Sequence, residues 1–223
     1  MRGENKSLFE RLTEEFIWLN SKYSHPPYHK RLMKEVFLSA LDKTDKVIDI
    51  GCGAGGLSRK LAKMVIEGEV VGIDISEGYI KKIKRSMERN KSGAYRNLVF
   101  MLASAEDIPC PDNYFDHAVV SESFGFWSEP EKGLEEIRRV LKLGGKLYVV
   151  NSYKEAPISA RISVKVFSLF SAYKENLYST QEYRRFFERA RFTVVGQKKI
   201  MGTSLMTIGI KKYISGPIIY RWG

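Results

Sequence analysis

The sequence predicts an α/β fold in which parallel βαβ units are wound onto both faces of one sheet. Two observations lead to this prediction. Short apolar runs alternate with amphipathic stretches from residue 46 to residue 151, and a glycine-dense turn joins the first run to the first amphipathic stretch. A chain of 223 residues with 43% hydrophobic content can bury one substantial core, so we expect a single domain over residues 1–223.

The expected elements follow one another in a regular order. Before the first strand, residues 8–19 and 31–41 have the apolar spacing of helices. The alternating part comprises strand 46–50, helix 55–66, strand 69–74, helix 77–90, strand 97–102, strand 116–121, helix 131–141 and strand 145–151. The remaining expected elements are helices at 158–173 and 180–190 and strands near 192–200 and 203–212.

The glycine-dense turn after the first strand is typical of a nucleotide-type ligand site. Glycines at 51, 53 and 55 permit backbone angles that other residues resist, and they let N–H groups approach a ligand without interference from a Cβ atom. The second strand ends in Asp74, about 20 residues after the turn, where a carboxylate can accept hydrogen bonds from ribose hydroxyls. No Gly-Lys-Ser or Gly-Lys-Thr ends the turn, which argues against a triphosphate loop. Dinucleotide binding and S-adenosylmethionine binding remain.

Four segments, in order, resemble the class I S-adenosylmethionine-dependent methyltransferases. Asp49 to Gly55 matches the first motif of that family, D-x-G-x-G-x-G. Residues 105–109 and 111–116 are similar to its third-strand segment and to the lead into its fourth strand. Residues 136–147 are similar to its E-x-x-R-V-L-K-P-G-G-x-L run, with Leu143 where proline is usual. The resemblance covers residues 40–150 and is closest to the branch that includes the ubiquinone and menaquinone biosynthesis enzymes.

The resemblance implies a Rossmann-like, doubly wound, seven-stranded sheet that is mostly parallel, with one antiparallel strand in a C-terminal hairpin. It also implies S-adenosyl-L-methionine as cofactor and S-adenosyl-L-homocysteine as product. We accordingly divide the domain into N-terminal helices (1–44), a cofactor-binding core (45–151), an acceptor-side insertion with a lid helix (152–180), and a C-terminal helix with the hairpin (181–223).

Open α/β sheets bind ligands at the carboxyl ends of their strands, so the candidate cofactor residues should share one crevice. By resemblance, Asp49 acts indirectly near the methionine amino group, and a turn-capping carboxylate is the alternative. The spacing of Asp74 favours ribose binding over capping of the next helix. Ser104 stands where many relatives carry an aspartate for the adenine amino group, and a serine accepts a weaker hydrogen bond. The predicted cofactor residues are Asp49, Gly51, Cys52, Gly53, Gly55, Asp74, Ile75, Ser104, Ala105, Glu106 and Ser121.

The acceptor side is expected after the fourth strand. Methyl transfer is a displacement at a sulfonium carbon, so alignment of the acceptor matters most, and a base is needed only when the acceptor carries a proton. Glu122 is the candidate base, with a capping or solvent-facing acid as the equal alternative. Helix 158–173 is expected to wall an apolar acceptor pocket or simply to pack on the domain. His25 and His29 lie in a segment that folds over the site in relatives, although a surface position in a turn is favoured for both.

Composition separates the remaining hypotheses. The formal charge of +11 comes from 37 Lys and Arg against 26 Asp and Glu, but the basic residues are dispersed, which favours solvated helix faces over a nucleic-acid groove. Two cysteines provide neither a disulfide framework nor a cysteine metal site, and we expect no metal. No segment approaches the ~20 apolar residues of a membrane span, so we expect a cytoplasmic protein.

The leading hypothesis is an enzyme that methylates a small molecule. The alternatives are an RNA or protein methyltransferase and a non-catalytic cofactor-binding module.

Overall fold

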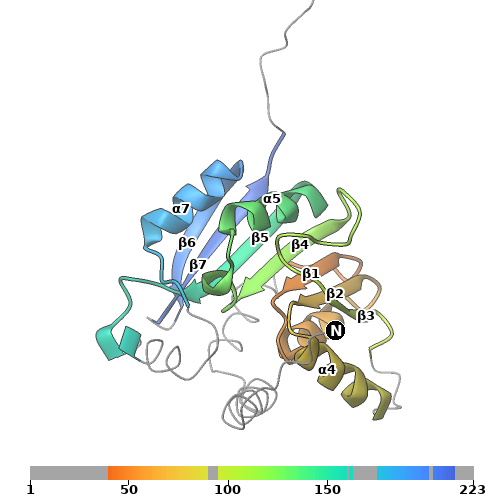
Figure 1. The fold of residues 1–223 in the computed structure, drawn as a ribbon. Helices are drawn as coiled ribbons and strands as arrows, with labels where there is room; N and C mark the ends of the chain where they lie inside the picture. Colours follow the sequence, from red (N-terminus) through yellow and green to blue (C-terminus); the bar gives the residue numbers. More distant parts are fainter. Residues whose placement is uncertain (1–39, 90–94, 160, 163–174, 201–202, 214–223) are drawn as a thin grey trace, which may run out of the picture.

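A computed structural model describes residues 40–89, 95–159, 161–162, 175–200 and 203–213. Its centre is a seven-stranded sheet of order β3-β2-β1-β4-β5-β7-β6 (Figure 1). The strands are β1 (Lys46–Ile50), β2 (Glu69–Asp74), β3 (Leu98–Leu102), β4 (Phe115–Ser121), β5 (Leu141–Ser152), β6 (Phe192–Ile200) and β7 (Ser204–Lys211). Only β7 runs against its neighbours, pairing antiparallel with both β5 and β6. The predicted mostly parallel sheet with one reversed strand is confirmed.

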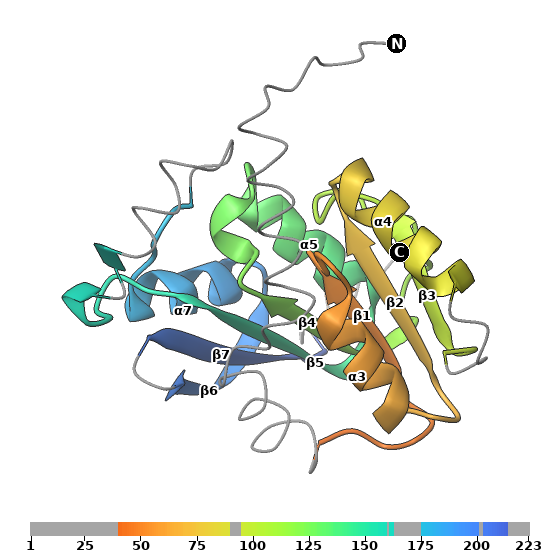
Figure 2. The same ribbon diagram turned by 90° about the horizontal axis from the view of Figure 1, so that it is seen from below.

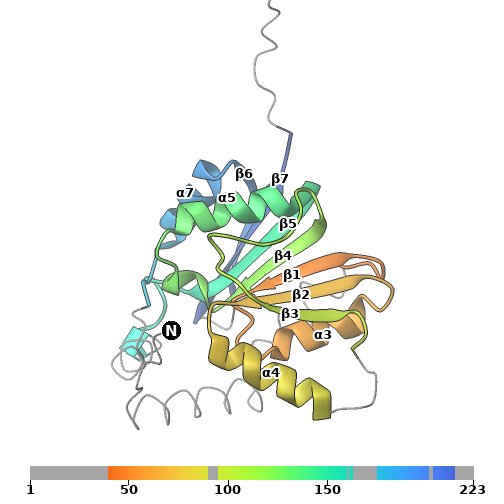
Figure 3. The ribbon, with the colours of Figure 1, turned by 45° about the vertical axis from the view of Figure 1, so that its right-hand side comes forward.

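Helices cover both faces of the sheet, as the predicted double winding requires. α5 (Pro130–Val140) and α7 (Thr180–Arg189) lie on one face, whereas α3 (Gly56–Met64) and α4 (Glu77–Arg89) lie on the other (Figure 3). Viewed from below, α3 lies over β1 and β2 (Figure 2). Ser179 begins α7 with a reciprocal capping box, in which its side chain accepts the Glu182 N–H and Glu182 accepts the Ser179 N–H.

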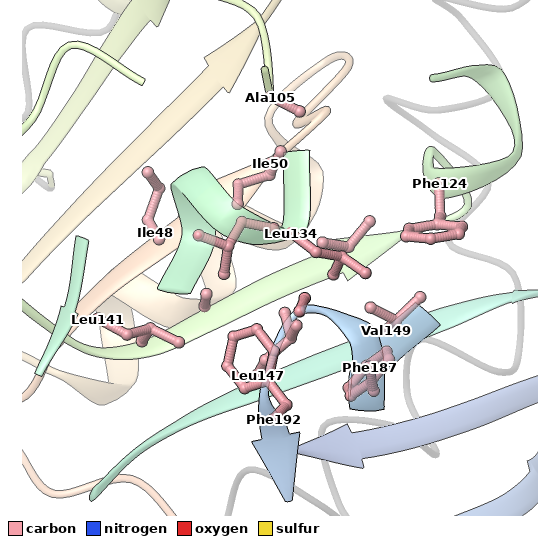
Figure 4. Close-up of a cluster of buried hydrophobic side chains, with 14 of the residues drawn as sticks. Ile48, Ile50, Ala105, Phe124, Leu134, Leu141, Leu147, Val149, Phe187 and Phe192 are labelled. Carbon is pink, nitrogen blue, oxygen red and sulfur yellow. The ribbon is translucent and has the colours of Figure 1, made fainter. Parts of the chain in front are cut away.

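Strands buried on both faces explain the continuous apolar runs in the sequence. In β5, Leu147 and Val149 face the α5–α7 layer, whereas Tyr148 and Val150 face the opposite one. Figure 4 shows the first cluster, in which Leu134 of α5 packs among side chains of several strands. Each fully buried aliphatic side chain of this kind contributes about 2 kcal/mol to folding.

The strand order places the functional end of the sheet. The chain runs outward from β1 through β2 to β3 and then returns to β4 on the other side of β1. At such a reversal the connections leave in opposite directions and open a crevice at the carboxyl ends of the two central strands. The segments that follow β1 and β4 therefore lie beside that crevice.

The described elements differ from the expected ones mainly at their ends. β5 begins at Leu141 rather than at 145, because Leu141 pairs with Phe115 before an irregular stretch that precedes the His117–Lys146 pair. The expected helices 8–19 and 31–41 and most of 158–173 lie outside the described residues, as do His25 and His29. Across the part of the chain that is described, no helix is long and apolar enough to cross a membrane.

Candidate cofactor and acceptor site

The glycine turn after β1 is held in a conformation that suits glycine alone. Gly51, Gly53 and Gly55 all have positive φ, at 72°, 52° and 74°. A Cβ on Gly51 would overlap Ser123, and one on Gly55 would lie 2.6 Å from the Phe100 ring. A Cβ on Gly53 would meet no heavy atom of the described residues within 4 Å. The middle of the turn therefore faces open space, from which a ligand can reach its backbone.

Asp74 anchors this turn to the end of β2. The N–H of Gly53 donates to Asp74 Oδ2 at 2.8 Å, and that of Ser76 donates to Oδ1 at 2.8 Å. Burial raises the pKa of Asp74, and the two backbone hydrogen bonds oppose this rise. Each carboxylate oxygen has a second lone pair, so Asp74 can still accept hydrogen bonds from a pair of hydroxyls. The spacing that predicted a ribose partner thus coincides with a structural role in shaping the turn.

Asp49 is a buried carboxylate beneath the same turn, with 1% of its surface exposed. Ser58 Oγ donates to Asp49 Oδ2 at 2.6 Å, and among the described residues no ion pair neutralises the aspartate. Burial raises the pKa of Asp49 to about 6; the Ser58 hydrogen bond opposes this rise and the charge of Asp74 adds to it. A buried anion without a cation is costly, so a cationic group arriving at the turn would be stabilised here.

Cys52 lies inside the turn but offers no reactive group. Its N–H donates to the Ile73 carbonyl at 2.9 Å, which fixes the turn against β2. Its side chain is buried, and burial raises the pKa of the thiol well above its usual value. The thiol is therefore neutral at physiological pH, and only the Cys52 backbone can serve a ligand.

Ser104, Ala105 and Glu106 follow β3, whose end is tied to β2 by a hydrogen bond from Ala103 N to Asp74 O. Ser104 Oγ lies 2.9 Å from Glu106 Oε2, while Ser128 Oγ and the Glu129 N–H donate to Glu106 Oε1 at 2.9 Å each. Burial would raise the pKa of Glu106, but these hydrogen bonds outweigh it and lower the pKa.

The side chains of this segment are thus engaged within the protein. The Ala105 methyl group is buried in the α5–α7 cluster, and Ser104 is paired with Glu106. After β3, mainly backbone groups are therefore left to bind a ligand. Ile75, directly after Asp74, is 68% exposed and provides an apolar surface there.

The segment after β4 contacts the glycine turn directly. Ser121 ends β4, and Ser123 Oγ donates to the Ile50 carbonyl at 2.8 Å beside Gly51. Glu122 between them has a φ of 52°, a conformation that costs a non-glycine residue about 1 kcal/mol or more. Its carboxylate accepts from Ser152 N and Ser152 Oγ at 3.2 and 3.3 Å, and from Ser204 Oγ at 2.8 Å. Glu122 therefore points toward the ends of β5 and β7, where burial raises its pKa.

Glu175, the partner of Asn151, was not among the predicted site residues. Asn151, fully buried at the end of β5, accepts the Phe124 N–H at 3.2 Å and donates to Glu175 Oε1 at 3.0 Å. Burial raises the pKa of Glu175 to about 7; the charge of Glu122 adds to the rise and Asn151 opposes it. No motif in the sequence surrounds Glu175.

Residues 48–149 match a family model described as a methyltransferase domain. With the sheet order and the glycine turn, this match defines the region as a class I S-adenosylmethionine-dependent methyltransferase domain.

Curated relatives place the domain near the ubiquinone and menaquinone branch. Over 139 residues the chain is 32% identical to the ubiquinone/menaquinone biosynthesis C-methyltransferase UbiE of Wigglesworthia glossinidia brevipalpis, covering 62% of this chain and 54% of the relative. It is 30% identical over 151 residues to the demethylmenaquinone methyltransferase of Symbiobacterium thermophilum, covering 67% and 59%. The chain thus spans little more than half the length of these relatives.

Solved structures share the fold at lower identity. One, a complex of the Haloferax volcanii Trm112 methyltransferase activator with a methyltransferase, matches with a TM-score of 0.74 and 21% identity over 93% of this chain and 99% of that one. A methyltransferase from Aquifex aeolicus that depends on S-adenosylmethionine matches with a TM-score of 0.68 and 21% identity, over 91% and 98%.

The cofactor of this domain class is S-adenosylmethionine, and the described residues fit it. Its ammonium group suits the uncompensated Asp49 carboxylate, and its ribose hydroxyls suit the remaining lone pairs of Asp74. The open approach to Gly53 leaves room for the ligand, and the exposed Ile75 offers an apolar contact. When bound, the cofactor supplies an electrophilic methyl group on a positively charged sulfur.

Proposed function

We propose that the protein transfers a methyl group from S-adenosylmethionine to a small molecule held in a partly apolar pocket. The observation that carries the acceptor class is the segment beyond β5, at the end of the sheet where the glycine turn lies (Figure 1). Ile158 and Ile162 in this segment are 72% and 54% exposed, which favours an apolar partner for them. The relatives named for ubiquinone, menaquinone and demethylmenaquinone support the same acceptor class.

The proposed roles follow from the contacts in the site. Asp49 favours the cofactor ammonium group, Asp74 accepts from the ribose, and the backbone of 104–106 borders the adenine. Gly51 and Gly53 allow the close backbone approach that fixes the methionine part. The segment 121–123 borders the transferable methyl group, because Ser123 packs on Gly51. Orientation of this kind supplies several kcal/mol of rate enhancement without a dedicated side chain.

Calorimetric titration with S-adenosylmethionine, S-adenosylhomocysteine and NAD tests the cofactor part. We expect both adenosyl ligands to bind and NAD not to bind. Asp74→Asn should weaken both adenosyl ligands about tenfold, because an amide is a poorer acceptor for two hydroxyls. Tyr213→Ser, at an 81% exposed position far along the chain from the turn, serves as the matched control. Binding of NAD alone would contradict the proposal.

Formation of S-adenosylhomocysteine with a panel of acceptors tests the acceptor part. The panel contains apolar hydroquinones and phenols, hydrophilic amines, total RNA and a mixture of unfolded proteins. Turnover confined to the apolar compounds, and reduced in an Ile158→Ser, Ile162→Ser double variant with unchanged cofactor affinity, is the expected result. Turnover confined to RNA or protein would contradict the small-molecule proposal.

An RNA or protein acceptor is the second candidate, and α4 is the observation that favours it. Lys81, Lys84 and Arg85 are exposed on this helix, although Lys81 is paired with Glu77 at 2.7 Å. This candidate predicts retention on RNA with a steep salt dependence.

A cofactor-binding module without transfer is the third candidate and predicts tight cofactor binding with no turnover on the whole panel. The cytoplasmic location expected from the sequence stays a prediction.

A further inference from the structure

A pair of half-buried carboxylates lies at the acceptor end of the sheet, and the proposed cofactor contacts use neither of them. Glu122 comes from the segment after β4, and Glu175 precedes α7. Burial and the charge of Glu122 raise the pKa of Glu175, whereas burial raises that of Glu122. Two carboxylates at the carboxyl ends of the central strands are candidates for a role in the reaction.

Glu175 is linked to the glycine turn by a short series of contacts. Ser123 packs on Gly51, the N–H of the next residue, Phe124, donates to Asn151 at 3.2 Å, and Asn151 donates to Glu175 at 3.0 Å. These contacts place Glu175 on the segment that borders the transferable methyl group.

Gly125 fixes the position of Glu175 further. The Asn176 N–H donates to the Gly125 carbonyl at 2.8 Å. A Cβ on Gly125 would lie 2.7 Å from Glu175 Cγ, so the glutamate side chain lies directly on the single turn of η2 (Phe124–Phe126). The side chain is therefore held over the turn that follows β4 rather than spread into solvent.

The two carboxylates differ in how well their negative charge is stabilised. Glu122 accepts three hydrogen bonds, from Ser152 N, Ser152 Oγ and Ser204 Oγ. Glu175 accepts one hydrogen bond, from the neutral amide of Asn151, and the described residues donate none to its Oε2 atom. Among them, Tyr183 of α7 also faces the pair, but it stays a neutral phenol because burial raises its pKa. Glu175 therefore holds a proton more tightly than a free carboxyl group does, and with a pKa of about 7 its charged, proton-accepting form is still populated near neutral pH.

We propose that Glu175 is the proton acceptor of the methyl transfer, through its Oε2 atom. The proposal rests on the proposed function and narrows it to acceptors that lose a proton when methylated, such as a hydroxyl group or an activated ring carbon. The acceptor atom forms its bond to the methyl carbon, and the carbon–sulfur bond breaks with its electron pair left on sulfur. Glu175 takes the proton that the acceptor loses. The positive charge on sulfur and the negative charge on Glu175 are removed together, so the step balances.

Proton release on ligand binding tests the proximity of Glu175 to the reacting sulfur without any acceptor. S-adenosylmethionine carries a positive sulfur, and S-adenosylhomocysteine does not. Near pH 7, the charged ligand should lower the proton affinity of Glu175 and release up to about half a proton more than the neutral ligand. Calorimetry in buffers of different ionisation enthalpy measures this difference. Glu175→Gln should remove the Glu175 part of it, while protons from the ligand's own amino group remain.

Glu122→Gln is the matched control, because it removes the neighbouring charge and keeps Glu175. It should move the pH at which the extra release is largest downward by about one unit or more, since the repulsion that raises the proton affinity of Glu175 is gone. In the unmutated protein the extra release should vanish near pH 5 and near pH 9, where Glu175 keeps one protonation state with either ligand. This pH series needs no variant and stays informative even when Glu175→Gln fails to fold.

The possible outcomes separate the two proposals. If neither adenosyl ligand binds, the proposed function fails and this inference fails with it. If both ligands bind with equal proton release, or if the extra release persists unchanged in a Glu175→Gln variant that binds S-adenosylhomocysteine normally, Glu175 does not sense the reacting centre. The proton-acceptor role is then wrong, while the proposed function stands.

Discussion

Replacement of Asp49 by asparagine should stabilise the protein near neutral pH and weaken cofactor binding. Asp49 is buried, with Ser58 as its hydrogen-bond donor, and its pKa rises from 3.8 to about 6. Because the folded state binds the proton more tightly than the unfolded state, the stability is fully present below pH 3.8 and is lost as the pH rises through 6. At about 1.4 kcal/mol per factor of ten, the buried charge costs about 3 kcal/mol at neutral pH.

Asparagine keeps an oxygen that accepts from Ser58 but brings an amide NH₂ group, which costs about 1 kcal/mol when imperfectly paired. Asp49→Asn should therefore gain about 2 kcal/mol near pH 7.5, or about 4–8 °C in Tm for a chain of this size. Near pH 4 the gain should disappear, because Asp49 is then protonated in the folded protein. Thermal unfolding at the two pH values measures both differences.

The same substitution should weaken S-adenosylmethionine binding by about tenfold to a hundredfold, because the charge attraction between the buried carboxylate and the ligand ammonium group is lost. Ser58→Ala is the companion variant: it keeps the charge and removes the donor, so it should lose stability near neutral pH and less near pH 4. The reasoning is refuted if Asp49→Asn destabilises the protein equally at both pH values, or if its cofactor affinity equals that of the unmutated chain.

Three further substitutions test local features. Gly55→Ala should destabilise the fold by about 2–3 kcal/mol in urea unfolding, because φ is 74° and the new Cβ would lie 2.6 Å from the Phe100 ring; an unchanged midpoint would contradict the close approach. Ser179→Ala should lower the free energy of unfolding by about 1 kcal/mol, because it removes half of the capping box with Glu182. Amide exchange at the start of α7 that is as slow as in the unmutated protein would argue against the cap. Arg139→Lys should lower the free energy of unfolding by about 2 kcal/mol, because lysine cannot bind both backbone carbonyls and the two carboxylates that Arg139 reaches. A loss of stability smaller than that caused by the exposed Lys198→Ala change would contradict this prediction.

The cofactor residues could be proposed from the sequence because they directly follow the ends of apolar strands, and their roles stay predictions. β1 and β2 are apolar runs with sharp ends, and the residues that follow them carry the chemistry. The positive φ angles of Gly51 and Gly55 were readable from the glycine spacing. The order of strands followed from the alternation of patterns and from the resemblance, and it placed those ends beside one another.

The contacts of the proposed acceptor half were harder to predict because they join residues far apart in the chain. Glu122 was selected for its position after β4, but nothing in its neighbourhood shows that Ser204, 82 residues away, binds its carboxylate. Glu175 owes its high pKa to burial and to the Glu122 charge, neither of which leaves a local pattern. The early start of β5 at Leu141 was also missed, since it depends on pairing with Phe115 rather than on the apolar run that follows.

The reversed direction of β7 brings its first residue to the end of the sheet where the glycine turn lies. A parallel strand would begin at the far edge of the sheet, whereas β7 begins beside the carboxyl ends of the central strands and places Ser204 on Glu122. The stretch matched by the methyltransferase family model ends at residue 149, before this hairpin. The contact between Ser204 and Glu122 therefore joins a residue outside the matched stretch to one inside it. Under the proposed function, changes around the start of β7 would alter the surroundings of Glu122 while the glycine turn is left untouched.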